Sequence, residues 1–466
     1  MTFLDFILML LYFTMALLVA VVIRIGNRNN RYYKKYFVKG LVVKMLAGIA
    51  FALFHTYYFT YGGDTKSYYH DMHIITNYFF DDPLATLGYL SEHFNYLTNE
   101  IRSATIFKWG TKEFFLIRFA TIINILGLNS YWSTTILFSV FSYVGTWQLY
   151  LVFAKRYPHL WNQMAWAVLF LPSFVFWGSG IMKDTLGVGF LGVFLYAINN
   201  IYENKKGKLG WAIIMAISAM VIFSVRAYIL FGLLPAVMIW IALGLKDKIR
   251  NPFVKLIFMP IILVVMVASV VGSFSMLSKY NSRFSADNVI GTAWSYQHWH
   301  YVEGQNTTEQ HGRGSSYSLG DYDATPLGVM KMFIPSVNVA LFRPYFWEVK
   351  NPAMAILSIE SFAFFLITIY IFLRVGPFVL IRAISSDSFL LMSLIFSIFF
   401  SFAVGFSTWN FGALARYKIP ALPFYAASLI LLNYYANLYR KQRKSGKARR
   451  NARQAFKPGQ MRSSLN

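Results

Sequence analysis

Apolar runs of about 18 to 23 residues recur along this chain, and each is long enough to cross the hydrocarbon core of a bilayer as an α-helix. A backbone inside lipid has to satisfy its own hydrogen bonds, so helices are the expected structure for these runs. Hydrophobic residues make up 57% of the 466 positions and charged residues only 13%. These proportions exclude an ordinary soluble globule and predict an all-α polytopic membrane protein.

About eleven runs are predicted to span the membrane. They cover residues 3–23, 40–60, 131–153, 163–180, 185–201, 209–225, 227–244, 253–275, 352–374, 388–406 and 418–438. The run at 114–127 is short for a span and contains Arg118, so we interpret it as a juxtamembrane or re-entrant helix. The resulting organisation is a membrane domain over residues 1–438, with large loops at 61–130 and 276–351, and a basic tail at 439–466.

The basic residues are distributed unevenly between the two sides of this arrangement. Of the 43 Lys and Arg residues, 28 lie in the tail or in the connections that the eleven spans place on the same side as the tail. The positive-inside rule makes that side cytoplasmic and the two large loops extracytoplasmic. The tail contains almost no aromatic residues, so we expect it to be attracted to anionic membrane lipids and not to nucleic acid.

The absence of cysteine limits the chemistry of the chain. No disulfide, thiolate nucleophile or Cys-based metal site can form, so oxygen and nitrogen groups have to carry any reaction. His298, His300 and His311 in the second large loop indicate a metal site only weakly, because no helix or strand fixes their spacing. No cofactor is therefore predicted with certainty, and a divalent metal is left open.

Ionisable residues gather where several spans reach the extracytoplasmic side. The stretch "YFTYGGDTKSYYHDM", residues 58–72, follows a long apolar run and contains two candidate carboxylates, Asp64 and Asp71. Segments far apart in the sequence bring further charges to the same depth: Lys183, Asp184, Arg226, Arg343, Arg416 and Lys418. Such residues cost free energy near lipid unless they are paired or hydrated, and they often mark substrate paths.

The residue types in this set point to one class of substrate. Arginine and lysine bind phosphate, and a carboxylate can accept the proton of a hydroxyl nucleophile. Aromatic faces with polar rims suit sugar rings, and the candidates are Tyr68, Trp177, Trp347 and Tyr417. A sugar linked to a polyprenyl phosphate would use all three properties, because its tail lies in lipid, its phosphate at the boundary and its sugar outside.

Three stretches resemble the GT-C glycosyltransferases, multi-helix enzymes that use lipid-linked sugar donors. They are "GGDTKSYY", "LPSFVFWGSGIMKDTLGVGFLGVFLYAINN" and "ARYKIPALPFYAASLILL". The resemblance implies a catalytic role for Asp64, with Asp71 the weaker candidate, and a phosphate-binding role for Arg416. It also implies a glycan or lipid acceptor and a bacterial inner-membrane location. The additional N-terminal helix and the lack of a large soluble C-terminal domain depart from the family pattern.

Two other functions are left open by the sequence. An oligosaccharide polymerase or ligase of surface polysaccharide assembly would also use extracytoplasmic arginines and polyprenyl carriers, without depending on an acid in the first large loop. A lipid or polysaccharide transporter would need charges near the membrane midplane, where Glu360 is the main acid within a predicted span.

Overall fold

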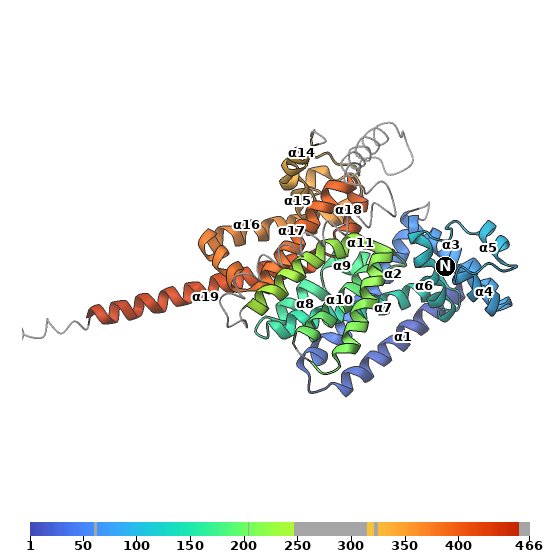
Figure 1. The fold of residues 1–466 in the computed structure, drawn as a ribbon, viewed down its shortest axis with the longest axis horizontal. Helices are drawn as coiled ribbons and strands as arrows, with labels where there is room; N and C mark the ends of the chain where they lie inside the picture. Colours follow the sequence, from blue (N-terminus) through green and yellow to red (C-terminus); the bar gives the residue numbers. More distant parts are fainter. Residues whose placement is uncertain (60–62, 204, 247–314, 321–324, 456–466) are drawn as a thin grey trace, which may run out of the picture.

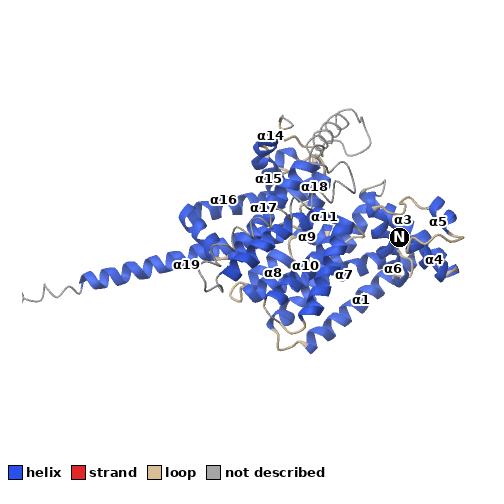
Figure 2. Ribbon diagram, in the orientation of Figure 1, coloured by secondary structure: helices blue, strands red, loops and turns tan. Residues whose placement is uncertain are grey.

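The computed structural model describes residues 1–59, 63–203, 205–246, 315–320 and 325–455. Within these residues the long elements are all helices, as Figure 2 shows. An isolated antiparallel bridge joins Ser316 to Asn410. The predicted all-α class is confirmed for the described chain, whereas the predicted span at 253–275 and the three loop histidines lie outside the described residues.

Seven described helices are long and apolar enough to cross a membrane. They are Phe3–Gly26 (α1), Tyr33–Tyr58, Tyr131–Arg156 (α7), Lys183–Tyr202 (α10), Lys208–Leu245 (in α11), Pro352–Ser386 (α16) and Ser388–Thr408 (α17). The second of these consists of α2 (Val38–Leu53) between two π-helical turns, η1 (Tyr33–Phe37) and η2 (Phe54–Tyr58). A bent pair adds an eighth, Phe411–Tyr417 (α18) and Leu422–Lys441 (in α19, Leu422–Ala455), with an angle of 69°. This composition is consistent with a polytopic membrane protein, although the count is lower than the predicted eleven.

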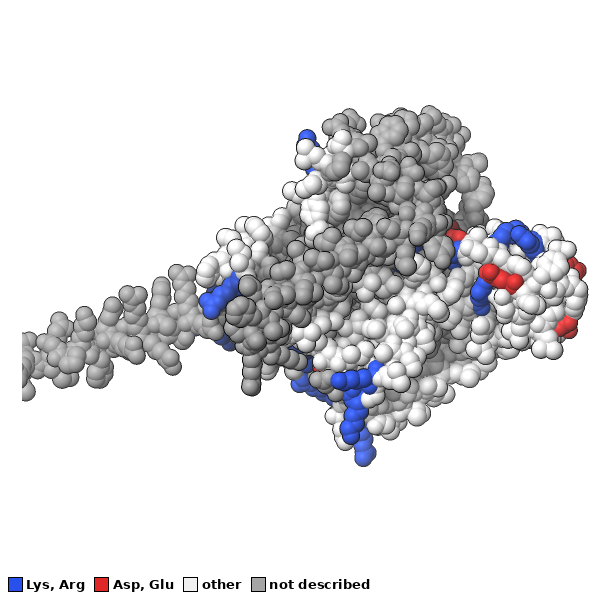
Figure 3. All heavy atoms as spheres, in the orientation of Figure 1, with Lys and Arg blue, Asp and Glu red and all other residues white. Residues whose placement is uncertain are grey.

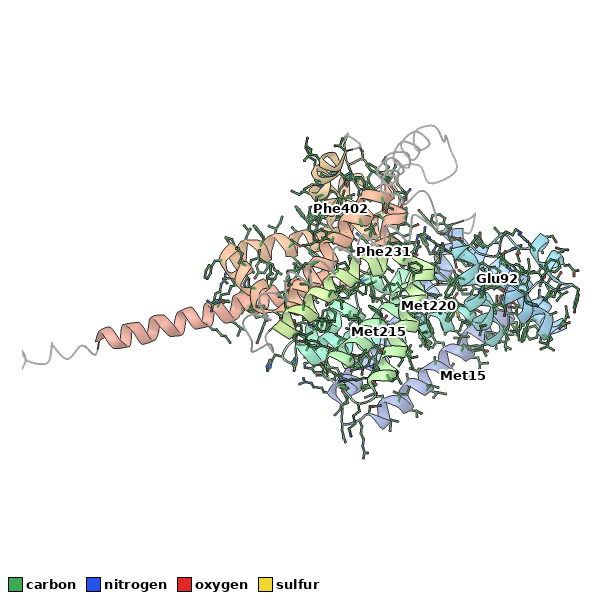
Figure 4. All side chains as sticks on the ribbon, in the orientation of Figure 1. Met15, Glu92, Met215, Met220, Phe231 and Phe402 are labelled. Atoms are coloured by element: carbon green, nitrogen blue, oxygen red, sulfur yellow. The ribbon has the colours of Figure 1, made fainter. Side chains whose placement is uncertain are left out.

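Helix α11, Lys208–Lys246, accounts for part of that difference because its two arms fold back on each other. Arg226 interrupts it with non-helical backbone angles, φ −151° and ψ 62°. The ring centroids of Phe223 and Phe231 are 6.3 Å apart, whereas eight residues of straight helix rise about 12 Å. In Figure 4, Met215 and Met220 mark the first arm and Phe231 the second. The arms correspond to the predicted spans at 209–225 and 227–244.

The predicted span at 163–180 is divided into two short helices, α8 (Trp161–Leu169) and α9 (Pro172–Trp177). Pro172 occupies the first turn of α9, where its missing N–H costs nothing, but it cannot continue the hydrogen bonding of α8. Helix α16 is interrupted in a similar way, since Gly376 adopts φ +70° and Pro377 follows it. A proline follows directly at both breaks.

The first large loop contains four helices: α3 (Gly63–Asp81), α4 (Pro83–Leu90), α5 (Thr98–Ala104) and α6 (Lys112–Leu126). They lie around the N-terminus in Figure 1, beyond the start of α1. Helix α6 is short, as the sequence predicts for residues 114–127, and its Arg118 forms an ion pair with Glu92. The Ser130 hydroxyl donates to the Asp5 carboxylate at 2.6 Å and so ties the end of this loop to α1. The described part of the second large loop forms α14 (Pro326–Lys331), α15 (Phe333–Phe342) and the 3₁₀ turn η4 (Phe346–Glu348).

One end of the helix bundle collects the connections that contain most of the basic residues; we call it the tail end. The Arg31 guanidinium donates to the Pro158 carbonyl at 3.2 Å, joining the connections after α1 and after α7. The carboxylate of Asp387, between α16 and α17, accepts hydrogen bonds from Tyr157 and Tyr435, both at 2.8 Å. Figure 3 shows Lys and Arg without many acids on this side, and acidic and basic residues together at the opposite end, near α3–α6.

Small residues bring α7 and α10 into close contact along the middle of the bundle. A Cβ on Gly145 would lie 1.7 Å from the Gly189 carbonyl oxygen, and a Cβ on Gly192 would lie 1.9 Å from that of Gly145. Only glycine fits such spacing, and small residues are the usual means of close helix approach in lipid. This packing fixes the position from which Lys183 and Asp184, at the start of α10, enter the candidate site.

The absence of cysteine makes the sidedness directly measurable. We expect Ser103→Cys and Ser316→Cys, which replace exposed residues in the two large loops, to react with a membrane-impermeant maleimide in intact cells. Arg28→Cys and Lys206→Cys, exposed in basic connections, should react only after permeabilisation, because the positive-inside rule places those connections in the cytoplasm. Labelling of position 206 in intact cells would contradict this orientation.

Candidate functional site

Asp64 and Arg416 form an ion pair although they are 352 residues apart. Arg416 in α18 donates from Nη1 to the Asp64 Oδ2 at 2.8 Å. Asp64 lies in the first turn of α3, directly after Gly63, which adopts the left-handed φ of +54°. A glycine adopts this left-handed conformation without the steric cost that a side chain would add. The Asp64 side chain is 51% exposed and that of Arg416 19%, so the carboxylate is accessible from solvent.

Asp184 and Arg226 form a second, more deeply buried ion pair. The Arg226 Nη2 donates to Oδ2 at 2.9 Å, and its Nε lies 2.9 Å from Oδ1. The side chains are 10% exposed for Arg226 and 4% for Asp184. Arg226 is also the residue at which α11 breaks. The ion pair therefore joins the break between the two arms of α11 to the first turn of α10. A planar guanidinium facing both carboxylate oxygens is a strong and directional arrangement.

Tyr417 links the two ion pairs. The Arg226 guanidinium carbon lies 4.6 Å from the centre of the Tyr417 ring, and that of Arg416 lies 5.8 Å from the same ring. The ring of Tyr228 is 6.2 Å from that of Tyr417. Cation–π contacts of this kind are stronger where water is excluded, so Tyr417 holds α18 against the break in α11 and positions Arg416 beside Asp184.

Lys183 adds a third ion pair, with a residue that the sequence analysis did not select. Its Nζ donates to the Glu113 Oε1 at 2.5 Å. Glu113 lies in the first turn of α6, directly before the apolar run that was interpreted as a juxtamembrane helix. An acid at the start of such a helix, in the same loop as Asp64, was the available signal. We call the six residues of the three pairs the ion-pair cluster: Asp64, Arg416, Asp184, Arg226, Lys183 and Glu113.

The charges of the cluster shift the pKa values of its acids. Burial raises the pKa of the Asp64 carboxyl, but Arg416, and then Lys183 and Arg226, outweigh it and lower the pKa below its ordinary value. Burial likewise acts to raise the pKa of Glu113, and the hydrogen bond and positive charge of Lys183 outweigh it and lower that pKa. Both acids are therefore ionised at neutral pH, and the paired charges stabilise one another.

Aromatic residues form one wall of the cluster. Tyr68, one turn after Asp64 in α3, is buried and packs on Phe107 with ring centroids 5.2 Å apart. Trp177 lies at the end of α9, 6.1 Å from the ring of His55. A Cβ on Gly63 would lie 3.6 Å from the His55 ring, so Asp64 begins its helix directly over these rings. Of the aromatic candidates, Tyr68, Trp177 and Tyr417 thus lie next to or within the cluster.

The remaining candidates lie in other environments. Asp71 is fully buried, and its carboxylate accepts from the backbone N–H groups of Ile106 and Phe107 at 2.9 and 2.8 Å. It holds the segment after α5 in place and does not face the cluster. Trp347 is 78% exposed and stacks on Tyr345 in the second large loop, with ring centroids 4.7 Å apart.

Two predicted phosphate-binding residues have separate partners. The Arg343 Nε lies 3.0 Å from both carboxylate oxygens of Glu348, five residues further along the chain. Lys418 is only 2% exposed, and its Nζ donates to the Ser361 hydroxyl at 3.2 Å. Both cations lie at helix ends, where the sequence analysis placed them. Their side chains, however, contact α16 and η4 instead of the ion-pair cluster.

The described residues contain no group of three or more His, Cys, Asp or Glu side chains that could hold a metal ion. In the cluster each carboxylate faces a cation, so its oxygens are already engaged by positive charge. No known protein family, curated protein or solved structure matches the chain.

The buried pair should contribute strongly to stability. Asp184→Asn leaves the buried Arg226 without its counter-ion, and we expect a loss of about 3–5 kcal/mol in the free energy of unfolding. The matched control is Glu203→Gln, which removes the acid of an exposed pair with Lys205 and should cost less than about 1 kcal/mol. Unfolding of the purified protein in detergent measures both. Equal stability of the two variants would show that Asp184 does not hold Arg226.

Proposed function

We propose that this protein is an integral membrane glycosyltransferase of the GT-C type that transfers a sugar from a polyprenyl phosphate to a glycan or lipid acceptor. The observation that supports this most is the contact between Asp64 and Arg416. These are the two residues to which the family resemblance assigns the catalytic acid and the phosphate ligand, and the fold brings them together from opposite ends of the chain. Arg226 and Lys183 lie in the same cluster and supply further positive charge.

The three cations of the cluster differ in how readily they can accept a phosphate. Arg226 faces a nearly inaccessible carboxylate, and Lys183 is 12% exposed and faces Glu113. Arg416 is paired with Asp64, whose side chain is half exposed. The pair of Asp64 and Arg416 is therefore the one in which a phosphate oxygen can most readily replace the carboxylate. For this reason Arg416 is the first phosphate ligand in the proposal. Arginine suits this role because its planar fork matches phosphate geometry.

The same exchange prepares Asp64 for catalysis. Arg416 is the largest of the charges that lower the pKa of Asp64, so neutralising Arg416 with phosphate raises that pKa. A carboxylate with a higher pKa is a stronger base. Donor binding would in this way release Asp64 from its partner and increase its basicity at the moment when the acceptor hydroxyl has to lose its proton.

The proposed transfer is a single displacement. Asp64 accepts the proton of the acceptor hydroxyl while the hydroxyl oxygen forms a bond to the anomeric carbon. The bond between that carbon and the phosphate oxygen breaks, and its electron pair stays on the polyprenyl phosphate. Arg416 and its neighbouring cations stabilise this charge more strongly in the transition state than in the ground state. One carboxylate without a covalent partner implies inversion at the anomeric carbon.

The location is part of the proposal. In Figure 1 three helices that contribute to the cluster, α3, α6 and α18, lie away from the place where α19 leaves the bundle, and the basic residues of the tail end indicate the cytoplasmic side. The active site would then face the extracytoplasmic side of the bacterial inner membrane, where the phosphate of a lipid carrier lies at the boundary and its sugar projects outward. Of the aromatic wall, the half-buried Trp177 would contact the sugar, whereas Tyr68 is buried behind it.

The first test is Asp64→Asn. General-base help is typically worth about 10² to 10⁴ in rate, so turnover of purified protein with a lipid-linked sugar should fall by that factor. Binding of the product polyprenyl phosphate should be equal or tighter, because the variant removes the group that competes for Arg416. Glu100→Gln, an exposed acid in the same loop, is the control and should keep full activity.

Each outcome of this test separates the candidate functions. A folded Asp64→Asn variant with near-full turnover would contradict the general-base role and favour a polymerase or ligase that relies on arginine. Retained anomeric configuration in the product would exclude a single displacement even if Asp64 is essential. Lipid-linked substrate that crosses the membrane without being chemically altered would identify a transporter.

The second test is Arg416→Lys. Lysine keeps the charge but loses the bidentate fork, so we expect the KM for the donor to rise about tenfold or more while the KM for the acceptor changes little. Lys331→Arg, an exposed cation in the second large loop, serves as the control for exchange of the two residue types. If only the KM for the acceptor changed, Arg416 would contact the acceptor and not the donor phosphate, which would contradict the proposal.

A further inference from the structure

An open cavity of about 470 Å³ lies at the tail end, far from the ion-pair cluster in the fold. It is lined by Tyr370, Leu373 and Arg374 from α16 and by Arg440 from α19. Arg374 lies two residues before the break of α16 at Gly376. The cavity therefore lies between α16, close to its break, and the long C-terminal helix. Figure 1 shows α16 beside the part of α19 that leaves the bundle.

The two arginines of this cavity are held by neutral groups. Arg374 donates to the Tyr370 hydroxyl and, at 2.6 Å, to the Asn437 side-chain oxygen. Arg440 donates to the Arg374 backbone carbonyl at 3.1 Å. Within the described part of the chain neither arginine forms an ion pair, in contrast to the three cations of the ion-pair cluster. Both guanidinium groups thus present uncompensated positive charge.

The acids in the described connections of the tail end are engaged elsewhere, and Glu203 pairs with Lys205. The Asp387 carboxylate accepts from the hydroxyls of Tyr157 and Tyr435 and from the backbone N–H groups of Phe389 and Leu390, which begin α17. Its oxygens are therefore used in closing the helix ends. A counter-ion for the arginines has to come from outside the described chain.

Exposed apolar residues occur in the cavity lining, at Leu373, and in the segment of α16 that follows it. Leu373 is 78% exposed, and Phe378 and Ile381, just after the break in α16, are 72% and 64% exposed. Arg382 lies on the same short segment, with its guanidinium carbon 4.7 Å from the centre of the Tyr439 ring. A segment with exposed large apolar residues and arginines next to a membrane-spanning helix has the character of an interfacial helix. Figure 3 shows Lys and Arg side chains gathered here, where α19 leaves the bundle.

We propose that this cavity binds the phosphate of an anionic phospholipid, with the headgroup between Arg374 and Arg440 and the acyl chains along Leu373 and Phe378. A phosphate supplies the negative charge that the site lacks, and basic pockets between helices bind anionic headgroups in this way. Exposed Leu373 in the lining, and the exposed apolar residues just after the break in α16, favour a phospholipid over a free phosphate ion, because acyl chains can cover them. This site does not depend on the proposed glycosyltransferase activity.

The experiment measures lipid retained by the purified full-length protein. The protein is exchanged into detergent with phosphatidylglycerol or with phosphatidylcholine, and bound lipid is counted by native mass spectrometry. We expect phosphatidylglycerol to be retained in preference to phosphatidylcholine, and Arg374→Gln or Arg440→Gln to weaken its retention by roughly fivefold each. Arg28→Gln, an exposed arginine in another basic connection, is the matched control and should retain lipid as the unaltered protein does.

Several results would overturn the proposal. Equal loss in the Arg28→Gln control would show that the general positive charge of this side attracts the lipid and that the cavity does not. Displacement of phosphatidylglycerol by an equal concentration of inorganic phosphate would indicate a free anion site. If Arg374→Gln fails to fold, Arg440→Gln is the decisive variant, because Arg440 is exposed at the surface. Unchanged retention of phosphatidylglycerol by Arg440→Gln would refute the site.

Discussion

The contact between Arg226 and Asp184 is the interaction on which the arrangement of the site depends. A guanidinium that is largely removed from water needs a counter-ion, and this one finds it in the first turn of α10. Because Arg226 stands at the break of α11, the same contact fixes where the two arms of that helix turn. Tyr417 covers the Arg226 guanidinium and so brings α18, and with it Arg416, to Asp64.

The arginines at the two ends of the bundle have different partners. At the ion-pair cluster each cation faces a carboxylate of the protein, so a phosphate would compete with that carboxylate for the cation. At the tail end Arg374 and Arg440 are held by neutral oxygen atoms and leave their charge uncompensated. The first arrangement suits a substrate that has to be bound, changed and released, whereas the second suits a lasting association with anionic lipid.

The helix pattern was predictable where it follows from local composition, and less so where the chain bends. The apolar runs that became α1, α7 and α10 were located to within a few residues, since a bilayer-length run has one stable structure in lipid. The run at 163–180 became α8 and α9 because Pro172 cannot continue a helix. The proline was visible in the sequence, but a proline within an apolar run is compatible with a kink as well as with a break.

The sequence by itself determined that the chain is helical and suited to a membrane, and that its basic residues favour one side. It also selected Asp64, Arg226 and Arg416 as candidates, because charges next to apolar runs are costly and therefore conspicuous. Only the tertiary structure decided which charges meet. Arg416 pairs with Asp64, while Arg343 and Lys418, equally prominent in the sequence, bond to Glu348 and Ser361. Partner choice depends on distances of a few ångströms between segments hundreds of residues apart, and helix packing, rather than any local pattern, sets those distances.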